Sequence, residues 1–137
     1  MSALLSLRLP EPPSSNRYWR VFRGRAVKSG DARAYSTLVL ADYRRQTTAI
    51  QRQQLPLDGP VGISLAWYRS CKSGDLDNRA KVLLDAVKGL LYHDDKQVEC
   101  LTMTRHESPR KGYILVELWT ALPPIGAGGA LLLRAGG

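Results

Sequence analysis

The sequence has few cysteines and lacks long apolar runs. Only two of its 137 residues are cysteine, Cys71 and Cys100. These are too few for a disulfide framework and lack the paired spacing of a zinc site, so we interpret both as buried thiols. No apolar run approaches the length that spans a bilayer, and no basic segment followed by an apolar one marks a secretory leader. We therefore expect a cytoplasmic protein.

Acidic residues are scarce in the first half of the chain, although the net charge is +8 overall. Residues 1–60 hold ten Lys and Arg against four Asp and Glu, whereas residues 61–137 hold ten against eight. Between residues 16 and 33 the basic side chains alternate with aromatic ones, which suits a nucleic-acid backbone with rings free to stack on open bases. From composition alone, a solvated basic loop is an equal alternative. The candidate DNA-binding residues are Asn16, Arg17, Arg20, Arg23, Arg25 and Lys28.

The remaining pattern predicts a single α+β domain over residues 1–121, with a mixed β-sheet packed against two helices. Alternating or β-rich stretches predict strands at 3–9, 61–68, 98–106 and 113–121, and a small hairpin at 18–22 and 26–29. Helical periodicity predicts helices at 31–53 and 77–91. The core stripe expected for the second helix comprises Ala80, Leu83, Leu84, Val87, Leu90 and Leu91. The Pro-, Gly- and Ala-rich residues 122–137 are expected to form a flexible tail.

The first predicted helix has an apolar face that two polar residues interrupt. Asp42 and Gln46 fall on this face, so we consider it a possible interface between copies of the chain. The apolar members of the face are Tyr35, Leu38, Val39, Tyr43, Ala49 and Ile50.

Five aspartates gather within the 21 residues from 75 to 95 of this basic chain. In the second predicted helix Asp77, Lys81 and Asp85 are spaced by four, which is also the pattern of ordinary ion pairs on a solvated helix face. That explanation does not cover Asp75, before the helix, or Asp94 and Asp95, which follow its end, where the helix dipole disfavours carboxylates. Hard oxygen ligands from separated positions are what Mg²⁺ or Mn²⁺ requires, so the crowding favours a metal site.

Two separated motifs resemble the RusA family of Holliday-junction resolvases, which are common in bacteria and their prophages. The first runs from Pro12 to Tyr18 and is followed by Arg23-Gly24-Arg25. The second comprises Asp75-Leu76-Asp77-Asn78 with Lys81, then Asp85-Ala86, then Asp94 to Val98. The resemblance covers residues 5–120 and implies a RusA-like fold.

The resemblance also implies an activity and roles for particular residues. It implies a homodimeric, Mg²⁺-dependent endodeoxyribonuclease, with Mn²⁺ able to substitute, that nicks opposing strands of four-way DNA junctions in recombination and repair and leaves 5′-phosphate and 3′-hydroxyl ends. Asp75, Asp77 and Asp95 would bind the metal, and Lys81 would contact the scissile phosphate. Asp85 is a possible support for Lys81, and Asp94 is the alternative third ligand. His93 would be a base or, more simply, a helix-end cap.

Two other functions remain open at this point. One is a metal-dependent nuclease that acts on other branched DNA, such as flaps. The other is a non-catalytic protein that binds and organises branched DNA.

Overall fold

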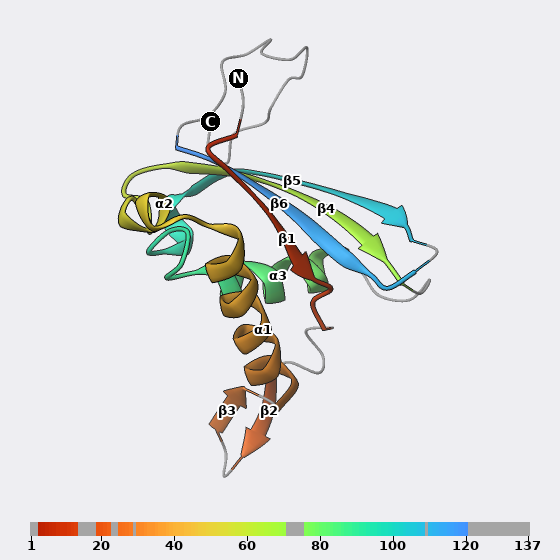
Figure 1. Cartoon of the computed structure of the whole chain (residues 1–137). Helices are drawn as coiled ribbons and strands as arrows, with labels where there is room; N and C mark the ends of the chain where they lie inside the picture. The colour runs from red at the N-terminus through yellow and green to blue at the C-terminus, as the bar shows by residue number, and fades with distance from the viewer. Residues whose placement is uncertain are drawn as a thin grey trace.

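The computed structural model describes residues 3–13, 19–22, 25–28, 30–70, 76–108 and 110–120, with side chains left out at 19–22, 25–28, 77 and 78. Its centre is a four-stranded mixed sheet (Figure 1). The strands are β1 (Leu5–Pro10), β4 (Val61–Arg69), β5 (Val98–Glu107) and β6 (Tyr113–Trp119), in the order β1-β6-β4-β5. β4 and β5 are parallel, and the other two pairs are antiparallel. The predicted strands and the α+β class are confirmed.

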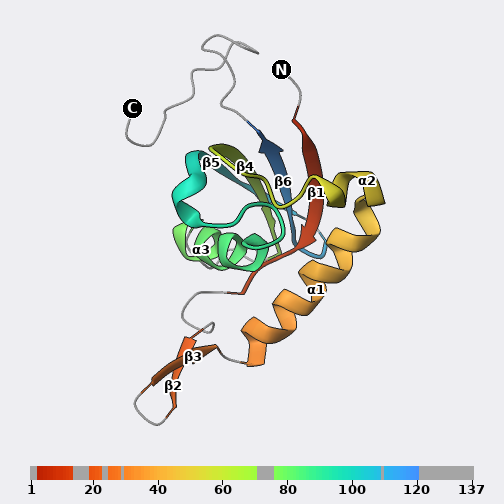
Figure 2. The ribbon, with the colours of Figure 1, turned by 90° about the vertical axis from the view of Figure 1, so that its left-hand side faces the viewer.

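Helices pack against one face of this sheet. α1 (Gly30–Gln46) and α3 (Leu76–Val87) both lie on that side (Figures 1 and 2). The alternation of each strand places leucine, isoleucine and valine toward the helices, as in β1, where Leu5, Leu7 and Leu9 are buried. In the described part of the chain no helix covers the opposite face, which carries alternating side chains such as Arg8, Tyr68 and Tyr113.

A separate hairpin precedes α1. β2 (Trp19–Phe22) pairs antiparallel with β3 (Arg25–Lys28), and the hairpin projects away from the main sheet beside the start of α1 (Figure 2). The predicted hairpin is confirmed, and residues 23–24 of its turn lie outside the described residues. The hairpin carries part of the predicted basic segment away from the sheet.

The predicted helix at 31–53 is wrong in its length and in part of its buried face. α1 ends at Gln46, where Thr47 Oγ1 donates to the Tyr43 carbonyl at 2.5 Å. Thr48 then caps the short α2 (Ala49–Gln53) by accepting from the Gln51 N–H. The break turns the chain, so Ile50 is 69% exposed, and Leu38 within α1 is 54% exposed.

The second predicted helix is shorter than expected. α3 ends at Val87, because Gly89 adopts φ +87° and reverses the chain. The expected core stripe is confirmed at Ala80, Leu83 and Val87, which are buried, and Val82 joins them. This early end brings the following residues back beside the helix.

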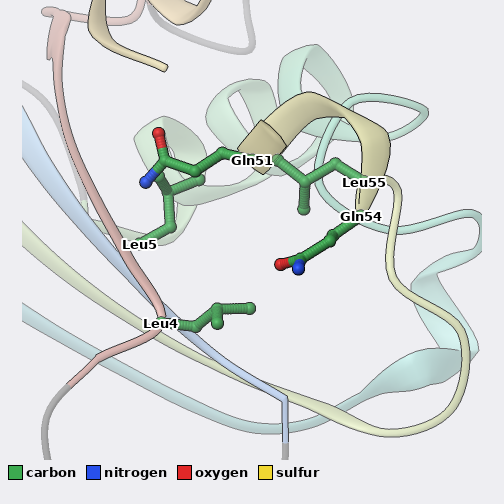
Figure 3. A pocket seen from close by; sticks show the side chains of 5 residues that line it. All are labelled: Leu4, Leu5, Gln51, Gln54 and Leu55. Carbon is green, nitrogen blue, oxygen red and sulfur yellow. The ribbon is translucent and has the colours of Figure 1, made fainter. Parts of the chain in front are cut away.

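α2 covers the beginning of the sheet. Leu4 and Leu5 lie opposite Gln54 and Leu55, around a hollow of about 20 Å³ (Figure 3). A space of this size holds about one water molecule, so it is a packing gap and not a substrate site.

Candidate active site

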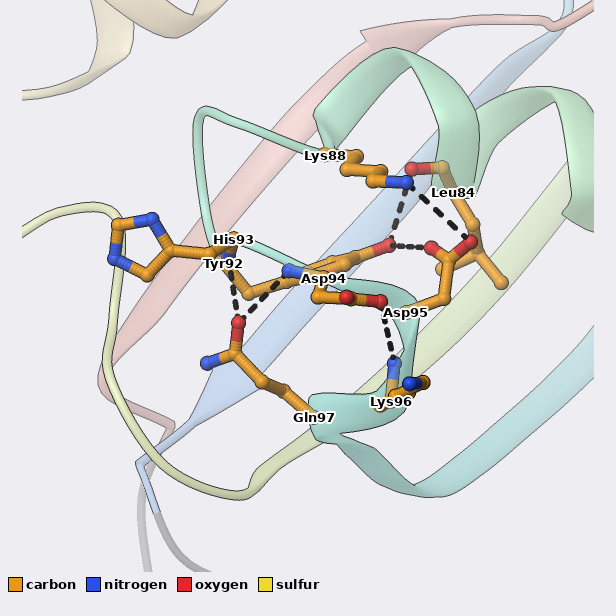
Figure 4. Close-up of polar contacts among 8 residues, drawn as sticks. All are labelled: Leu84, Lys88, Tyr92, His93, Asp94, Asp95, Lys96 and Gln97. Carbon is orange, nitrogen blue, oxygen red and sulfur yellow. Dashed lines mark hydrogen bonds and ion pairs between the residues drawn. The ribbon is translucent and has the colours of Figure 1, made fainter.

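The residues after α3 fold back along its last turns. The Gly89 N–H donates to the Tyr92 carbonyl at 2.7 Å, and the Leu57 N–H donates to the Leu91 carbonyl at 2.9 Å. Leu91 and Tyr92 are fully buried in the core. The next residues are therefore held firmly at the surface. We call residues 92–97 the acidic turn (Figure 4).

Asp94 is occupied by the backbone of the acidic turn. Its carboxylate accepts from the Lys96 N–H at 3.1 Å and caps the 3₁₀ helix η2 (Asp95–Gln97). Gln97 completes the capping box, because its Oε1 accepts from the His93 and Asp94 N–H groups at 2.7 and 2.8 Å. The Gln97 amide also donates to the Leu57 and Gly59 carbonyls. These bonds fix the shape of the turn.

Asp95 faces α3 instead. One of its oxygens lies 3.5 Å from the Tyr92 hydroxyl, and the other lies 3.9 Å from Lys88 Nζ (Figure 4). The Asp95 side chain is 68% exposed, so solvent and ligands can reach it. Of the two adjacent aspartates, Asp95 is the one whose carboxylate is not used in capping.

The buried Tyr92 lies within the influence of two of the predicted carboxylates. Its buried hydroxyl donates to the Leu84 carbonyl at 3.0 Å. Burial raises the pKa of Tyr92 most, and the negative charges of Asp95 and then Asp85 raise that pKa further. Asp85 of α3 and Asp95 of the acidic turn are therefore both near enough to the Tyr92 hydroxyl for their charges to act on it.

The other predicted site residues are described to different extents. Lys81 is exposed on α3, one helical turn from both Asp77 and Asp85. Asp77 lies in the first turn of α3, but only its backbone is described, and Asp75 lies outside the described residues. Within the part of the chain whose side chains are described, no three His, Cys, Asp or Glu residues are grouped closely enough to hold a metal ion. The ligand set of Asp75, Asp77 and Asp95 therefore stays a prediction.

The basic segment is also described only in part. Arg20 belongs to β2, and Arg25 and Lys28 belong to β3, each by its backbone alone. Asn16, Arg17 and Arg23 lie outside the described residues, as does the tail at 122–137. Their contacts with DNA remain predictions.

His93 is not a cap of α3. The helix ends at Val87, six positions earlier, because of the turn at Gly89. The His93 Nε2 instead lies 3.0 Å from Asp58 Oδ1, with both side chains exposed. The cap interpretation is therefore wrong, and the alternative role as a base stays untested.

Glu11 joins the ends of two strands, a role that the sequence analysis missed. Its carboxylate accepts from Trp67 Nε1 at 2.7 Å and from the Ser70 N–H and Oγ at 3.1 and 2.8 Å. Ser70 directly precedes residues 71–75, so Glu11 anchors the chain where it enters the predicted metal-binding segment. Pro12 and Pro13 indicate that the chain leaves β1 in a fixed direction. They do not indicate which residues Glu11 binds.

Arg79 adds a second link at the same place. It donates to the Pro12 carbonyl, and its guanidinium carbon lies 5.2 Å from the centre of the Trp67 ring. α3, the exit of β1 and the exit of β4 are thereby tied together. At this end of the sheet Pro12, where the first predicted motif begins, therefore lies beside Arg79 of α3.

None of the helices in the described part of the chain is long and apolar enough to cross a membrane. The buried Cys100 carries a free thiol, as predicted. Cys71 lies outside the described residues.

Comparison with known proteins identifies the family. The model of the family Endodeoxyribonuclease RusA matches residues 10–118. A crossover junction endodeoxyribonuclease RusA of Shigella sonnei (strain Ss046) is 37% identical over 97 residues, which cover 68% of this chain and 75% of the relative. The protein of the same name from Escherichia coli (strain K12) is 36% identical over 95 residues, with the same coverage. The match covers α3, the acidic turn and most of β6, so the chain belongs to the RusA family of endodeoxyribonucleases and is a nuclease.

Proposed function

We propose that this nuclease resolves four-way DNA junctions by paired nicks, in a reaction that requires a divalent metal ion. The substrate follows from the family and from relatives that are named crossover junction endodeoxyribonucleases. The basic balance of the chain suits a polyanionic substrate. Recombination and repair of DNA in the bacterial cytoplasm is the setting that this activity fits.

The observation that carries the proposal is the placement of Asp95. Its carboxylate is exposed and turned toward α3, and it shares the surroundings of Tyr92 with Asp85. Carboxylate oxygens suit Mg²⁺, with Mn²⁺ as a substitute, and mutual repulsion between them is relieved by a cation. We assign Asp75, Asp77 and Asp95 as the ligands, with Asp94 left to its capping role. A metal bound there would supply an activated water and neutralise charge on the phosphate.

Lys81 has the position of a transition-state stabiliser. Its exposed ammonium is carried by α3 one turn beyond Asp77, on the solvent side of the helix. There it would bind a non-bridging oxygen of the scissile phosphate, whose charge grows during attack. Asp85, one turn further, would orient Lys81 from the same face.

Paired nicks require two active sites. A four-way junction presents two symmetry-related strands, whereas this chain has one group of predicted metal ligands. A two-fold symmetric homodimer supplies the second group. The hairpin of β2 and β3, which projects beyond the sheet, would contribute Arg20, Arg25 and Lys28 to DNA binding, along with Asn16, Arg17 and Arg23.

The test compares a synthetic four-way junction with a flap whose arms have the same sequences, each titrated with Mg²⁺. We expect symmetric nicks in the junction, ends that a ligase reseals, and slower cleavage of the flap. Preference for the flap would contradict junction resolution and favour the broader branched-DNA nuclease. Binding to the junction without cleavage at any Mg²⁺ or Mn²⁺ concentration would favour the non-catalytic role.

A further inference from the structure

A second cationic surface lies at the edge of the sheet, away from the basic hairpin. It is a groove of about 460 Å³ where β1, α1 and the turn between β5 and β6 meet. We call it the β1 groove. Its charged lining residues are Arg8 of β1, Asp42 and Arg45 of α1, and Lys111 of the turn. Among the described lining residues, three cations therefore face one carboxylate.

The wall of the β1 groove is fixed by Gln46. Its side-chain oxygen accepts from the Arg8 N–H at 2.8 Å, and its amide donates to the Arg8 carbonyl at 2.7 Å. Gln46 thus takes the place of a neighbouring strand along the free edge of β1. Its location on an otherwise apolar helix face, which we considered a sign of an interface, is explained by this contact within the chain.

A ladder of planar side chains holds Arg8 in place. The Arg8 guanidinium lies 3.8 Å from the centre of the Tyr113 ring. Tyr113 stacks on Tyr68, and Tyr68 stacks on His106, each with ring centres 4.7 Å apart. The ladder crosses all four strands on the face without helices. A guanidinium that is already ordered loses less conformational entropy when it binds a ligand.

The charges of the β1 groove favour an anionic ligand. Arg45 Nη2 pairs with Asp42 Oδ1 at 2.5 Å, which neutralises the one carboxylate in the lining. In the described part of the chain no acidic side chain forms an ion pair with Arg8 or Lys111. The C-terminal residues 120–137 contain no Asp or Glu, so they supply no anionic side chain for the groove. The net charge of +8 also favours an anion from outside the chain.

The β1 groove also adjoins the end of the sheet that holds α3. Its wall residue Gly112 packs so tightly on Glu11 that an added Cβ would lie 2.7 Å from the Glu11 carboxylate. Glu11 in turn binds Ser70, which leads into residues 71–75. A polyanion that lies in the groove is therefore close to Glu11, which binds the end of β4 at Ser70.

We propose that the β1 groove binds the phosphodiester backbone of a DNA arm, with Arg8, Arg45 and Lys111 as phosphate contacts. The proposal rests on the proposed function in that DNA is the substrate, and it adds a contact surface separate from residues 16–28. The groove reads charge and not base sequence, so junction arms and linear duplex engage it alike.

The experiment measures the affinity of full-length variants for a fluorescent four-way junction in EDTA, over a range of salt concentrations. Each lost phosphate contact reduces the slope of log affinity against log salt by about 0.9. Arg45→Ala and Lys111→Ala should each show this reduction and bind about five- to tenfold more weakly at 0.1 M salt. Arg44→Ala is the matched control, because Arg44 neighbours Arg45 on α1 but does not line the groove.

Asp42→Asn provides a test that loss of folding cannot imitate. It removes the negative charge from the β1 groove and frees Arg45, so affinity should increase several-fold. Slopes for Arg45→Ala and Lys111→Ala equal to that of Arg44→Ala, or unchanged or weaker binding by Asp42→Asn, would overturn the proposal. Cleavage of the junction by the unmodified protein is scored separately, so a failed groove and a failed junction-resolving function give different results.

Discussion

The acidic turn and the β1 groove share one arrangement, a glutamine that binds backbone groups beside an exposed charged side chain, but the charges have opposite signs. In each, one glutamine binds backbone groups and so fixes the chain: Gln97 in the turn and Gln46 beside β1. In each, charged side chains next to that glutamine stay exposed, namely Asp95 in the turn and Arg8 in the groove. The difference lies in what neutralises the charge. Asp42 pairs with Arg45 at 2.5 Å, whereas the one ion pair of Asp95 within the described residues is with Lys88, at 3.9 Å. The acidic turn is therefore the region that is more dependent on an added cation.

The largest effect is expected from removing the negative charge of Asp95. Asp95→Asn should stop nicking while junction binding stays unchanged or becomes tighter, because a metal ligand and a negative charge that faces phosphate are both lost. We expect the same of Asp75→Asn and Asp77→Asn. Single-turnover cleavage and binding in EDTA measure the two effects.

Asp94→Asn is the matched control for Asp95→Asn. An asparagine retains much of the capping ability of Asp94, so stability should fall by less than about 1 kcal/mol and the cleavage rate should stay within a few-fold. If Asp94→Asn stops cleavage and Asp95→Asn does not, the assignment of the two residues is reversed.

The next effect concerns Lys81. Lys81→Ala should slow the chemical step by about 10²–10³-fold, as expected for the loss of one stabiliser of transition-state charge, while the junction Kd changes little. Lys96→Ala removes an exposed lysine of η2 and should leave the rate unchanged. A Lys81→Ala rate within threefold of the unmodified protein would reduce Lys81 to a partner of Asp77 and Asp85 on the helix surface.

Tyr92→Phe should alter stability rather than binding. Loss of the hydrogen bond to the Leu84 carbonyl should lower the free energy of unfolding by about 0.5–1.5 kcal/mol. The pH dependence is more specific. Because the pKa of Tyr92 is raised in the folded protein, its contribution is complete below the unfolded tyrosine pKa, near 10, and is lost as pH rises above that value.

Urea unfolding between pH 8 and pH 11 measures this contribution of Tyr92. The unmodified protein should lose stability above about pH 10 more steeply than Tyr92→Phe does. Equal decline in the two proteins would show that the Tyr92 hydroxyl is not kept neutral by its surroundings in the folded state.

The smallest effect tests whether the ladder prepares Arg8 for DNA. A double-mutant cycle of Arg8→Ala and Tyr113→Leu should give a coupling of about 0.5–1 kcal/mol in junction affinity, the usual size for an exposed cation–π pair. Measured melting temperatures separate this coupling from unfolding. Additive effects would mean that Tyr113 does not order Arg8 for binding.

Local patterns in the sequence predicted the strands, the hairpin and the core stripe of α3 correctly, because these depend on alternation and periodicity within one segment. These local patterns did not predict the positions of side chains that bind residues distant in the sequence. Gln46 interrupts an apolar face because it binds β1, 38 positions away in the chain. Glu11 is placed by Trp67 and Ser70, at least 56 positions away.

The ends of both helices show a second limit. The apolar periodicity continued past Thr47 and Thr48, yet α1 ends there. Both threonines are β-branched, and their hydroxyl groups bind backbone groups. In the same way, apolar Leu90 and Leu91 continued the stripe of α3 past Gly89, where positive φ ends the helix. For the candidate site, the crowding of aspartates in a basic chain was enough to predict which residues to consider. The different environments of Asp94 and Asp95 could be seen only from the hydrogen bonds of the acidic turn.

The strand order has a consequence for how the molecule matures. β1 is the first strand of the sheet, but its partner is β6, so that Leu5 pairs with Leu118. During synthesis β1 must wait until nearly the whole domain has left the ribosome before its edge can be paired. The β1 groove takes Arg8 from the first strand and Tyr113 from the last. A nascent chain therefore lacks this cationic surface until the domain is complete.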